Sequence, residues 1–152
     1  MLEIGKKAPA FKLPAADGST KSLKDYKGQK VLIWFFPKAN TPGCTAEGCN
    51  LKDNYEELQN SGLEVLGVSA DTPKKQANFV KKYDFPFPML CDESTEMIQK
   101  YGAWGLKKFM GREYDGIHRI SYLIDEDGKV EHVWEKVKTK THGDDVAAYL
   151  QS

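Results

Sequence analysis

The sequence predicts an α/β fold in which helices flank a central mixed β-sheet, with a short β-hairpin at the amino terminus. Segments with the composition of buried strands alternate along the chain with segments of helical periodicity. Two strand segments near the carboxyl terminus are joined by Glu-Asp-Gly, a turn signal typical of an antiparallel hairpin. The 152 residues, 40% of them hydrophobic, suit a single domain over residues 1–152.

The first half of the chain supplies the amino-terminal hairpin and the first strands of the sheet. Residues 11–23, FKLPAADGSTKSL, are interpreted as two short strands around an Ala-Asp-Gly turn. The run VLIWFF (31–36) is continuous and rich in strand formers, as in a strand covered on both faces, and Pro37 ends it. A helix is expected from about Cys44 to Asn60, followed by a strand over 63–70.

The second half continues the alternation and ends with a hairpin and a helix. Thr72 before Pro73 predicts the start of a helix, because a capping residue precedes proline in the first turn. Two prolines in FPFP prevent that helix from continuing. A strand at 89–92, a helix from Ser94 to Tyr101, strands at 118–125 and 129–136 and a helix from Asp144 follow. This order fits a thioredoxin-like arrangement.

The charge of the chain argues against several classes of partner. Lys plus Arg equals Asp plus Glu at 22 each, so there is no electrostatic reason to expect nucleic acid or an anionic membrane. The basic run Lys136, Lys138 and Lys140 is interpreted as a solvated face. The amino terminus lacks the apolar region of a secretory signal, and no apolar run could span a bilayer. We therefore expect a cytoplasmic protein with no nucleic-acid or membrane partner.

Two of the three cysteines lie five positions apart in PKANTPGCTAEGCN, residues 37–50. A static disulfide framework is unexpected in a reducing compartment, where such cysteines are buried, metal-bound or reactive. Cys44 falls in the first helical turn, where unpaired backbone N–H groups and the helix dipole favour thiolate over thiol. Cys44 shares a helical face with four residues expected to pack on the sheet, Gly48, Leu51, Tyr55 and Leu58.

Cys49 is predicted to face away from Cys44. Five residues of helix turn about 500°, and two Cα atoms at that spacing are about 8.7 Å apart. A disulfide tolerates about 6.8 Å, so the two thiols can bond only if the helix unwinds. Gly48 lowers helix stability by about 1 kcal/mol relative to alanine and is expected to ease this unwinding. The arrangement suggests a two-step cycle, in which Cys44 becomes a sulfenic acid and Cys49 then condenses with it.

A peroxide O–O bond is a suitable target for such a thiolate, and its reduction needs groups that hold the peroxide. Thr41 supplies a hydroxyl, and the backbone amides of Gly43 and Cys44 are further donors. Arg119 is the best candidate for a cation, because it interrupts an otherwise apolar strand in which a charge needs a reason.

The stretch PKANTPGCTAEGC resembles the peroxiredoxin signature Pro-x-x-x-Thr-x-x-Cys at Pro37, Thr41 and Cys44. The second cysteine five residues later, with YGAWG, FMG and DGIHRISYLID, resembles the Q-type branch, also called bacterioferritin comigratory protein. The likeness covers nearly the whole chain. It implies a thioredoxin fold and a peroxidase of hydrogen peroxide and organic hydroperoxides. Cys44 would be peroxidatic and Cys49 resolving, with Pro37, Thr41 and Arg119 completing the pocket.

The same resemblance implies thioredoxin or a similar dithiol as the reductant, a monomer, and no metal or organic cofactor. Some members of the branch carry the resolving cysteine on a later helix, here 94–101, which has none. Cys91, just before it, is interpreted as a small hydrophobe in a strand or as an alternative resolving thiol. A thiol–disulfide oxidoreductase would normally show Cys-x-x-Cys, which is absent. A peroxide sensor, redox relay or chaperone on the same scaffold stays open.

Other polar residues near the motif are assigned structural roles. Glu47 is interpreted as a first-turn charge rather than a catalyst. His132 and His142 lie in polar stretches and are not expected to converge with the cysteines. The spacing of the cysteines and histidines does not match a zinc site.

Overall fold

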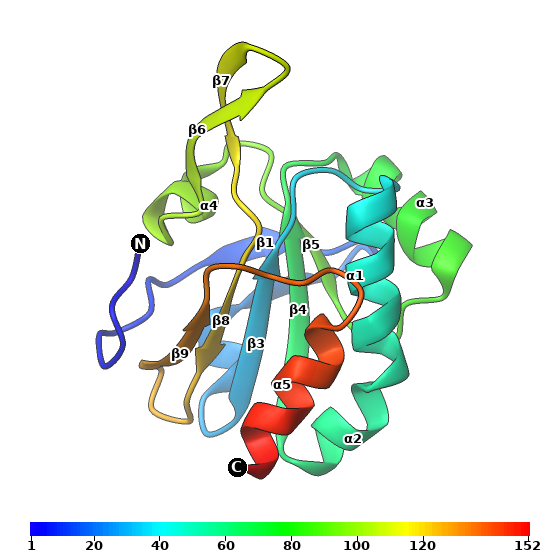
Figure 1. Cartoon of the computed structure of the whole chain (residues 1–152). Helices are drawn as coiled ribbons and strands as arrows, with labels where there is room; N and C mark the ends of the chain where they lie inside the picture. The colour runs from blue at the N-terminus through cyan, green and yellow to red at the C-terminus, as the bar shows by residue number, and fades with distance from the viewer.

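The computed structural model describes residues 1–152 and has the predicted layered α/β architecture (Figure 1). Its central sheet has five strands in the order β5-β4-β3-β8-β9. The sheet is mixed, because β3, β4 and β5 are parallel whereas β8 and β9 pair antiparallel. The strands are β3 (Lys30–Phe35), β4 (Leu63–Ser69), β5 (Met89–Cys91), β8 (Ile120–Ile124) and β9 (Val130–Trp134).

The predicted amino-terminal hairpin is confirmed, with β1 and β2 pairing antiparallel around the expected turn. None of the helices is long and apolar enough to cross a membrane. The hairpin strands and the helices are β1 (Lys12–Pro14), β2 (Thr20–Ser22), the 3₁₀ turn η1 (Leu23–Tyr26), α1 (Pro42–Asp53), α2 (Tyr55–Asn60), α3 (Pro73–Tyr83), α4 (Glu96–Lys100) and α5 (His142–Gln151).

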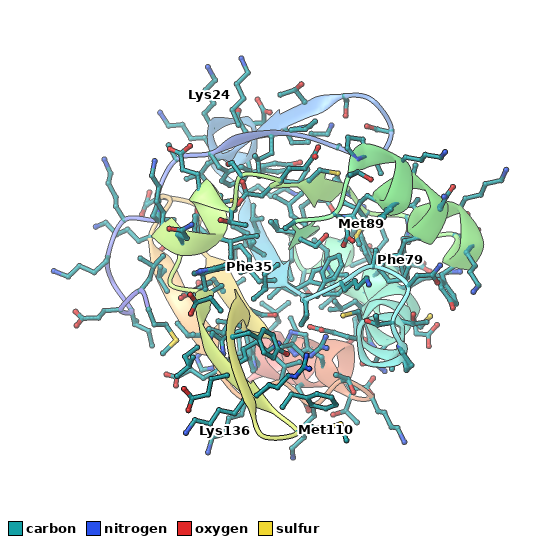
Figure 2. All side chains as sticks on the ribbon, turned by 90° about the horizontal axis from the view of Figure 1, so that it is seen from above. Lys24, Phe35, Phe79, Met89, Met110 and Lys136 are labelled. Carbon is teal, nitrogen blue, oxygen red and sulfur yellow. The ribbon has the colours of Figure 1, made fainter.

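The sheet separates two apolar clusters, one on each face. Residues of β3 alternate between them, with Ile33 and Phe35 in one cluster and Leu32 and Trp34 in the other. Helices α1, α3 and α5 cover the cluster that contains Trp34, whereas α4 and the amino-terminal segment cover the other. Figure 2 looks along the strands and labels Phe35 of one cluster and Phe79 of the other. This two-sided burial explains the continuous apolar run of β3.

The helix expected over residues 44–60 is two helices. The break lies at Asn54, whose side-chain amide donates to the Asn50 carbonyl at 2.9 Å and to the Asp144 carboxylate at 2.9 Å. A side chain that competes for backbone groups in this way commonly ends regular helix. Helical periodicity continues across the break, which is why the sequence did not reveal it.

A second hairpin, formed by β6 (Trp104–Phe109) and β7 (Arg112–Ile117), was missed by the sequence analysis. Its two-residue turn has positive φ at Met110 (+50°) and Gly111 (+78°), as in a type I′ turn. The sequence signal for such a turn is Asn-Gly, and here methionine replaces the asparagine. The hairpin projects from the end of the sheet at which α1 begins (Figure 1).

Gly48 lies where α1 packs tightly on the sheet, which helix propensity alone does not reveal. A Cβ there would lie 2.6 Å from Phe85 Cζ and 3.3 Å from Trp34 Cη2. We expect Gly48→Ala to destabilise the protein by about 1–3 kcal/mol through overpacking, although alanine favours helix by about 1 kcal/mol. Urea unfolding measures the change. A gain in stability would show instead that backbone propensity dominates, and Ala46→Gly measures that propensity without the packing.

Candidate active site

The loop after β3 carries two of the predicted pocket residues and is held in place by Asp71, which follows β4. Pro37 follows the buried end of β3, and the Ala39 amide donates to the Asp71 carboxylate at 2.7 Å. Thr41 precedes α1, and its hydroxyl donates to the Lys38 carbonyl at 2.7 Å rather than capping the helix. The Thr41 oxygen therefore keeps its lone pairs free to accept a hydrogen bond.

Arg119 reaches the start of α1 because of the register between β3 and β8. Ile120 lies opposite Phe35, so the preceding residue is beside the loop that leads to α1. Arg119 thus lies just before β8, not within a strand as the sequence suggested. Its Nη1 and Nη2 atoms are each 3.5 Å from Sγ of Cys44, which is fully buried. The guanidinium thus directs two N–H donors of one cation at the buried sulfur.

Glu47 also belongs to this cluster, although the sequence analysis treated it as a plain first-turn charge. Arg119 Nη1 donates to its Oε1 at 2.7 Å, and the side chain is fully buried. Burial raises the pKa of Glu47 to about 7, while the hydrogen bond and charge of Arg119 act in the opposite direction. Its position one helical turn after Cys44 was the available signal, since residues i and i+3 share a face.

His142 was expected to lie in polar surroundings, but it is buried next to Glu47. His142 begins α5 and is buried, with Nε2 2.8 Å from Ser121 Oγ and 3.8 Å from Glu47 Oε2. Burial lowers its pKa to about 4, Asp145 opposes this shift, and Arg119 adds to it. His142 is therefore neutral at pH 7, and α5 closes the side of the site behind Glu47.

These two buried groups are expected to give opposite pH dependences of stability. Folded Glu47 binds its proton up to about pH 7, above its ordinary pKa of 4.5, so its contribution falls as pH rises between those values. Folded His142 releases its proton down to about pH 4, below its ordinary 6.5, so its contribution rises over that range. Each contribution is at most about 3 kcal/mol.

Urea unfolding between pH 4 and 7 separates the two contributions. We expect Glu47→Gln to make stability rise more steeply with pH than in the wild type, and His142→Asn to make it fall. Equal slopes in wild type and both variants would contradict the assignment. The double variant serves as the control, because it removes both titrations.

The other two thiols differ from Cys44 in their surroundings. Cys49 is half-buried on α1, and burial, followed by the charge of Asp53, raises its pKa. Cys91 is buried in β5, and burial raises its pKa to about 11. All three cysteines are free thiols. The burial of Cys91 fits the interpretation as a small hydrophobe in a strand.

The base of the β6–β7 hairpin borders the same site. Lys107 in β6 donates to the Ile117 carbonyl at 2.9 Å. Burial lowers the pKa of Lys107, the charge of Arg119 lowers it further, and Cys44 opposes the shift. The hairpin is therefore close enough to the cysteine–arginine pair to interact with it electrostatically.

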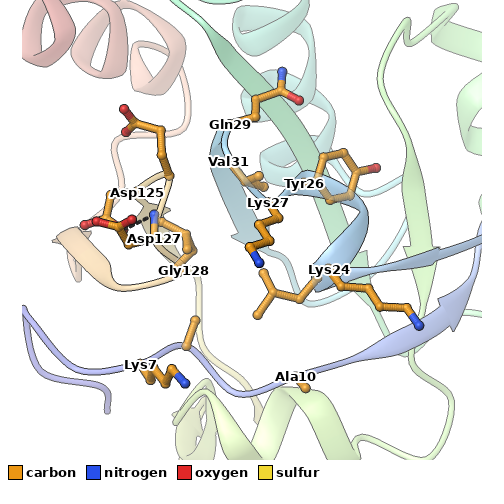
Figure 3. Close-up of a pocket in the computed structure, with 14 residues that line it drawn as sticks. Lys7, Ala10, Lys24, Tyr26, Lys27, Gln29, Val31, Asp125, Asp127 and Gly128 are labelled. Carbon is orange, nitrogen blue, oxygen red and sulfur yellow. Dashed lines mark hydrogen bonds between the residues drawn. The ribbon is translucent and has the colours of Figure 1, made fainter.

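A cavity of about 420 Å³ lies at the opposite end of the sheet from Cys44, where β3 begins and β8 ends (Figure 3). Its lining includes Val31 and Ile124 on the sheet, with Lys7, Lys24 and Lys27 around it. None of the five predicted site residues lines it. This cavity is separate from the cysteine site.

The fold agrees with comparisons to known proteins. The AhpC/TSA family model matches residues 4–133. The chain is 49% identical to peroxiredoxin Bcp of Escherichia coli strain K12 over 150 residues, covering 99% of this chain and 96% of the relative. It is 40% identical to peroxiredoxin Bcp of Bacillus subtilis over 151 residues, covering 99% and 94%.

Solved structures show the same relationship. The Xanthomonas campestris bacterioferritin comigratory protein, for which alkyl peroxide reduction activity is described, superposes with a TM-score of 0.90 at 31% identity over 98% of each chain. PrxQ of Xylella fastidiosa superposes with a TM-score of 0.93 at 27% identity, covering 99% of this chain and 96% of that one.

The family match, the two peroxiredoxin relatives and the superposed structures place the chain in the class of thiol-dependent peroxidases with a thioredoxin fold. The chain belongs to the AhpC/TSA family and, within it, to the Q-type (bacterioferritin comigratory protein) peroxiredoxins. It is thus a peroxidase that uses a peroxide substrate and a thiol reductant.

Proposed function

We propose that the protein reduces hydrogen peroxide and organic hydroperoxides with Cys44 as the peroxidatic thiolate. The observation that carries this proposal is the contact of two Arg119 guanidinium N–H groups with the buried Cys44 Sγ. The thiolate attacks one peroxide oxygen and the O–O bond breaks. Water or an alcohol leaves with a proton, and Cys44 becomes a sulfenic acid.

The proposed pocket groups have complementary roles toward the peroxide. The Thr41 hydroxyl donates to a backbone carbonyl, so its oxygen is available to accept the peroxide O–H. Arg119 stabilises the thiolate and then the negative charge that develops on the leaving oxygen. Pro37 has no N–H to solvate and limits the approach of water to the loop after β3.

Cys49 is proposed to resolve the sulfenic acid by condensing with it, which forms the Cys44–Cys49 disulfide and releases water. Helix α1 runs unbroken across both cysteines, so its first turns must unwind for this step. Unwinding breaks the Thr45 amide to Thr41 carbonyl bond of 2.9 Å and draws Glu47 from Arg119. Thioredoxin or a similar dithiol in the cytoplasm then restores two thiols, with the protein acting as a monomer.

We expect Cys49→Ser to stop oxidation at the sulfenic acid, because no thiol remains five residues away to condense with it. Excess peroxide should then drive Cys44 to sulfinic acid. Peptide mapping after one equivalent of peroxide identifies the linked thiols. In the wild type, circular dichroism should also show loss of helix on oxidation.

Cys91→Ser is the matched control and should still form the Cys44–Cys49 disulfide. A Cys44–Cys91 disulfide in the Cys49→Ser variant would make Cys91 the resolving thiol and overturn the role proposed for Cys49. An unchanged circular dichroism spectrum would argue against unwinding.

A further inference from the structure

The β6–β7 hairpin exposes an unusual amount of apolar surface. Four of the six exposed large hydrophobic residues in the chain lie on it: Leu106, Phe109, Met110 and Tyr114. Met110 is 87% exposed and has a positive φ, which a side chain other than glycine, asparagine or aspartate rarely adopts. Neither its packing nor its backbone conformation explains a methionine here. Such a residue points to contact with another molecule.

One face of this hairpin combines aromatic and basic side chains. In the ladder, Lys107 pairs with Tyr114 and Phe109 pairs with Arg112, so these four residues share a face. Lys107 is the member whose charge interacts with Cys44 and Arg119. The face therefore extends from the cysteine site to the tip of the hairpin.

The basic run interpreted as a solvated face also borders this site. Lys136, Lys138 and Lys140 are all exposed, and none forms an ion pair with a carboxylate. Thr139 lies between them, and a Cβ placed on Gly43 would be 3.8 Å from its Cγ2 and 3.1 Å from Arg119 Nη2. Figure 2 shows Lys136 and Met110 on one side of the molecule and Lys24 on the opposite side.

We propose that the β6–β7 hairpin and the 136–140 loop form the docking surface for an acidic protein dithiol that reduces the enzyme. This inference rests on the proposed Cys44–Cys49 disulfide. The exchange balances without another co-reactant: the partner's two thiols become a disulfide, and the enzyme disulfide becomes two thiols. The apolar hairpin supplies contact area, and the lysines attract the partner.

The charge distribution distinguishes this partner from the alternatives. A second copy of the chain would bring the same basic loop against itself in a symmetric dimer, which like charges disfavour. A nucleic acid or anionic membrane would match the lysines but would not need to reach the cysteine site. A dithiol reductant must approach these cysteines, and the two segments lie beside the end of α1 that carries Cys44.

The test reverses three charges on this surface and three elsewhere. We expect Lys136→Glu/Lys138→Glu/Lys140→Glu to raise the KM for a thioredoxin of net negative charge about tenfold at low salt, with the difference shrinking as salt is added. Peroxide oxidation of Cys44 and turnover with dithiothreitol should not change. The matched control is Lys7→Glu/Lys24→Glu/Lys27→Glu, which changes the net charge by the same amount around the cavity at the opposite end of the sheet (Figure 3). It should leave the KM for thioredoxin unchanged.

A second variant tests the hairpin without disturbing the fold. Met110→Asn suits the positive φ of the turn and should stabilise the protein. It should nevertheless raise the KM for thioredoxin, because it removes the exposed apolar side chain. If the lysine triple variant and Met110→Asn both keep the wild-type KM for thioredoxin and turn over with dithiothreitol, the docking surface is refuted. The proposed disulfide cycle is not affected by that result.

Four further outcomes would each contradict the proposal in a different way. Equal effects of the two triple variants would show that net charge, not this surface, governs the reaction. Loss of binding to phosphatidylglycerol vesicles at unchanged thioredoxin KM would assign the lysines to a membrane surface. Loss of a dimer in sedimentation velocity would assign the hairpin to self-association. Failure of wild-type turnover with dithiothreitol would instead overturn the proposed disulfide cycle.

Discussion

Cys44→Ser is expected to lower the rate of peroxide reduction at least about a thousandfold, because a serine hydroxyl is not ionised at neutral pH. The side chain is fully buried and nearly the same size, so the fold should persist. Steady-state turnover with thioredoxin and peroxide measures the loss, and circular dichroism checks the fold. This is the largest effect that we expect from a single substitution.

Cys91→Ser is the matched control for Cys44→Ser, since it places the same substitution at another buried thiol. It should keep the wild-type rate of peroxide oxidation. Activity near the wild-type level in Cys44→Ser would refute the assignment of the peroxidatic thiol. Equal losses in both variants would indicate damage to the core instead of loss of a nucleophile.

Arg119→Leu is expected to slow oxidation of Cys44 by peroxide about 10²–10³-fold, because it removes the cation that faces both the thiolate and the leaving oxygen. The pH midpoint of Cys44 alkylation should also rise, because the facing positive charge is gone. The substitution also removes the Arg119 Nη1–Glu47 Oε1 ion pair of 2.7 Å. Because Glu47 is buried and then has no permanently charged partner, we expect it to take up a proton. Stopped-flow oxidation and iodoacetamide labelling across pH measure the two effects.

Arg119→Lys keeps the charge but not the planar pair of donors, so it separates electrostatics from geometry. We expect its alkylation midpoint to stay near that of the wild type while the oxidation rate falls by an intermediate amount. An unchanged midpoint in Arg119→Leu would remove the proposed charge role. An oxidation rate in Arg119→Lys equal to that in Arg119→Leu would assign the whole effect to geometry.

The elements that the sequence predicted well are those with strong local signals. The apolar run of β3, the proline after the cap of α3 and the turn between β8 and β9 each depend on neighbouring residues only. The β6–β7 hairpin lacks such a signal, because methionine occupies its turn and exposed residues fill its strands. The break at Asn54 depends on Asp144, which is distant in the sequence.

By itself, the sequence determined the α/β class and the placement of Cys44 and Cys49 on one helix, with Cys44 in its first turn, because helical signals relate residues that are close in the chain. Only the tertiary structure decided what surrounds Cys44. The β3–β8 register brings Arg119 to its Sγ, and α5 brings His142 beside Glu47. Strand register and helix packing depend on contacts between distant segments, and periodicity along one segment carries no information about them.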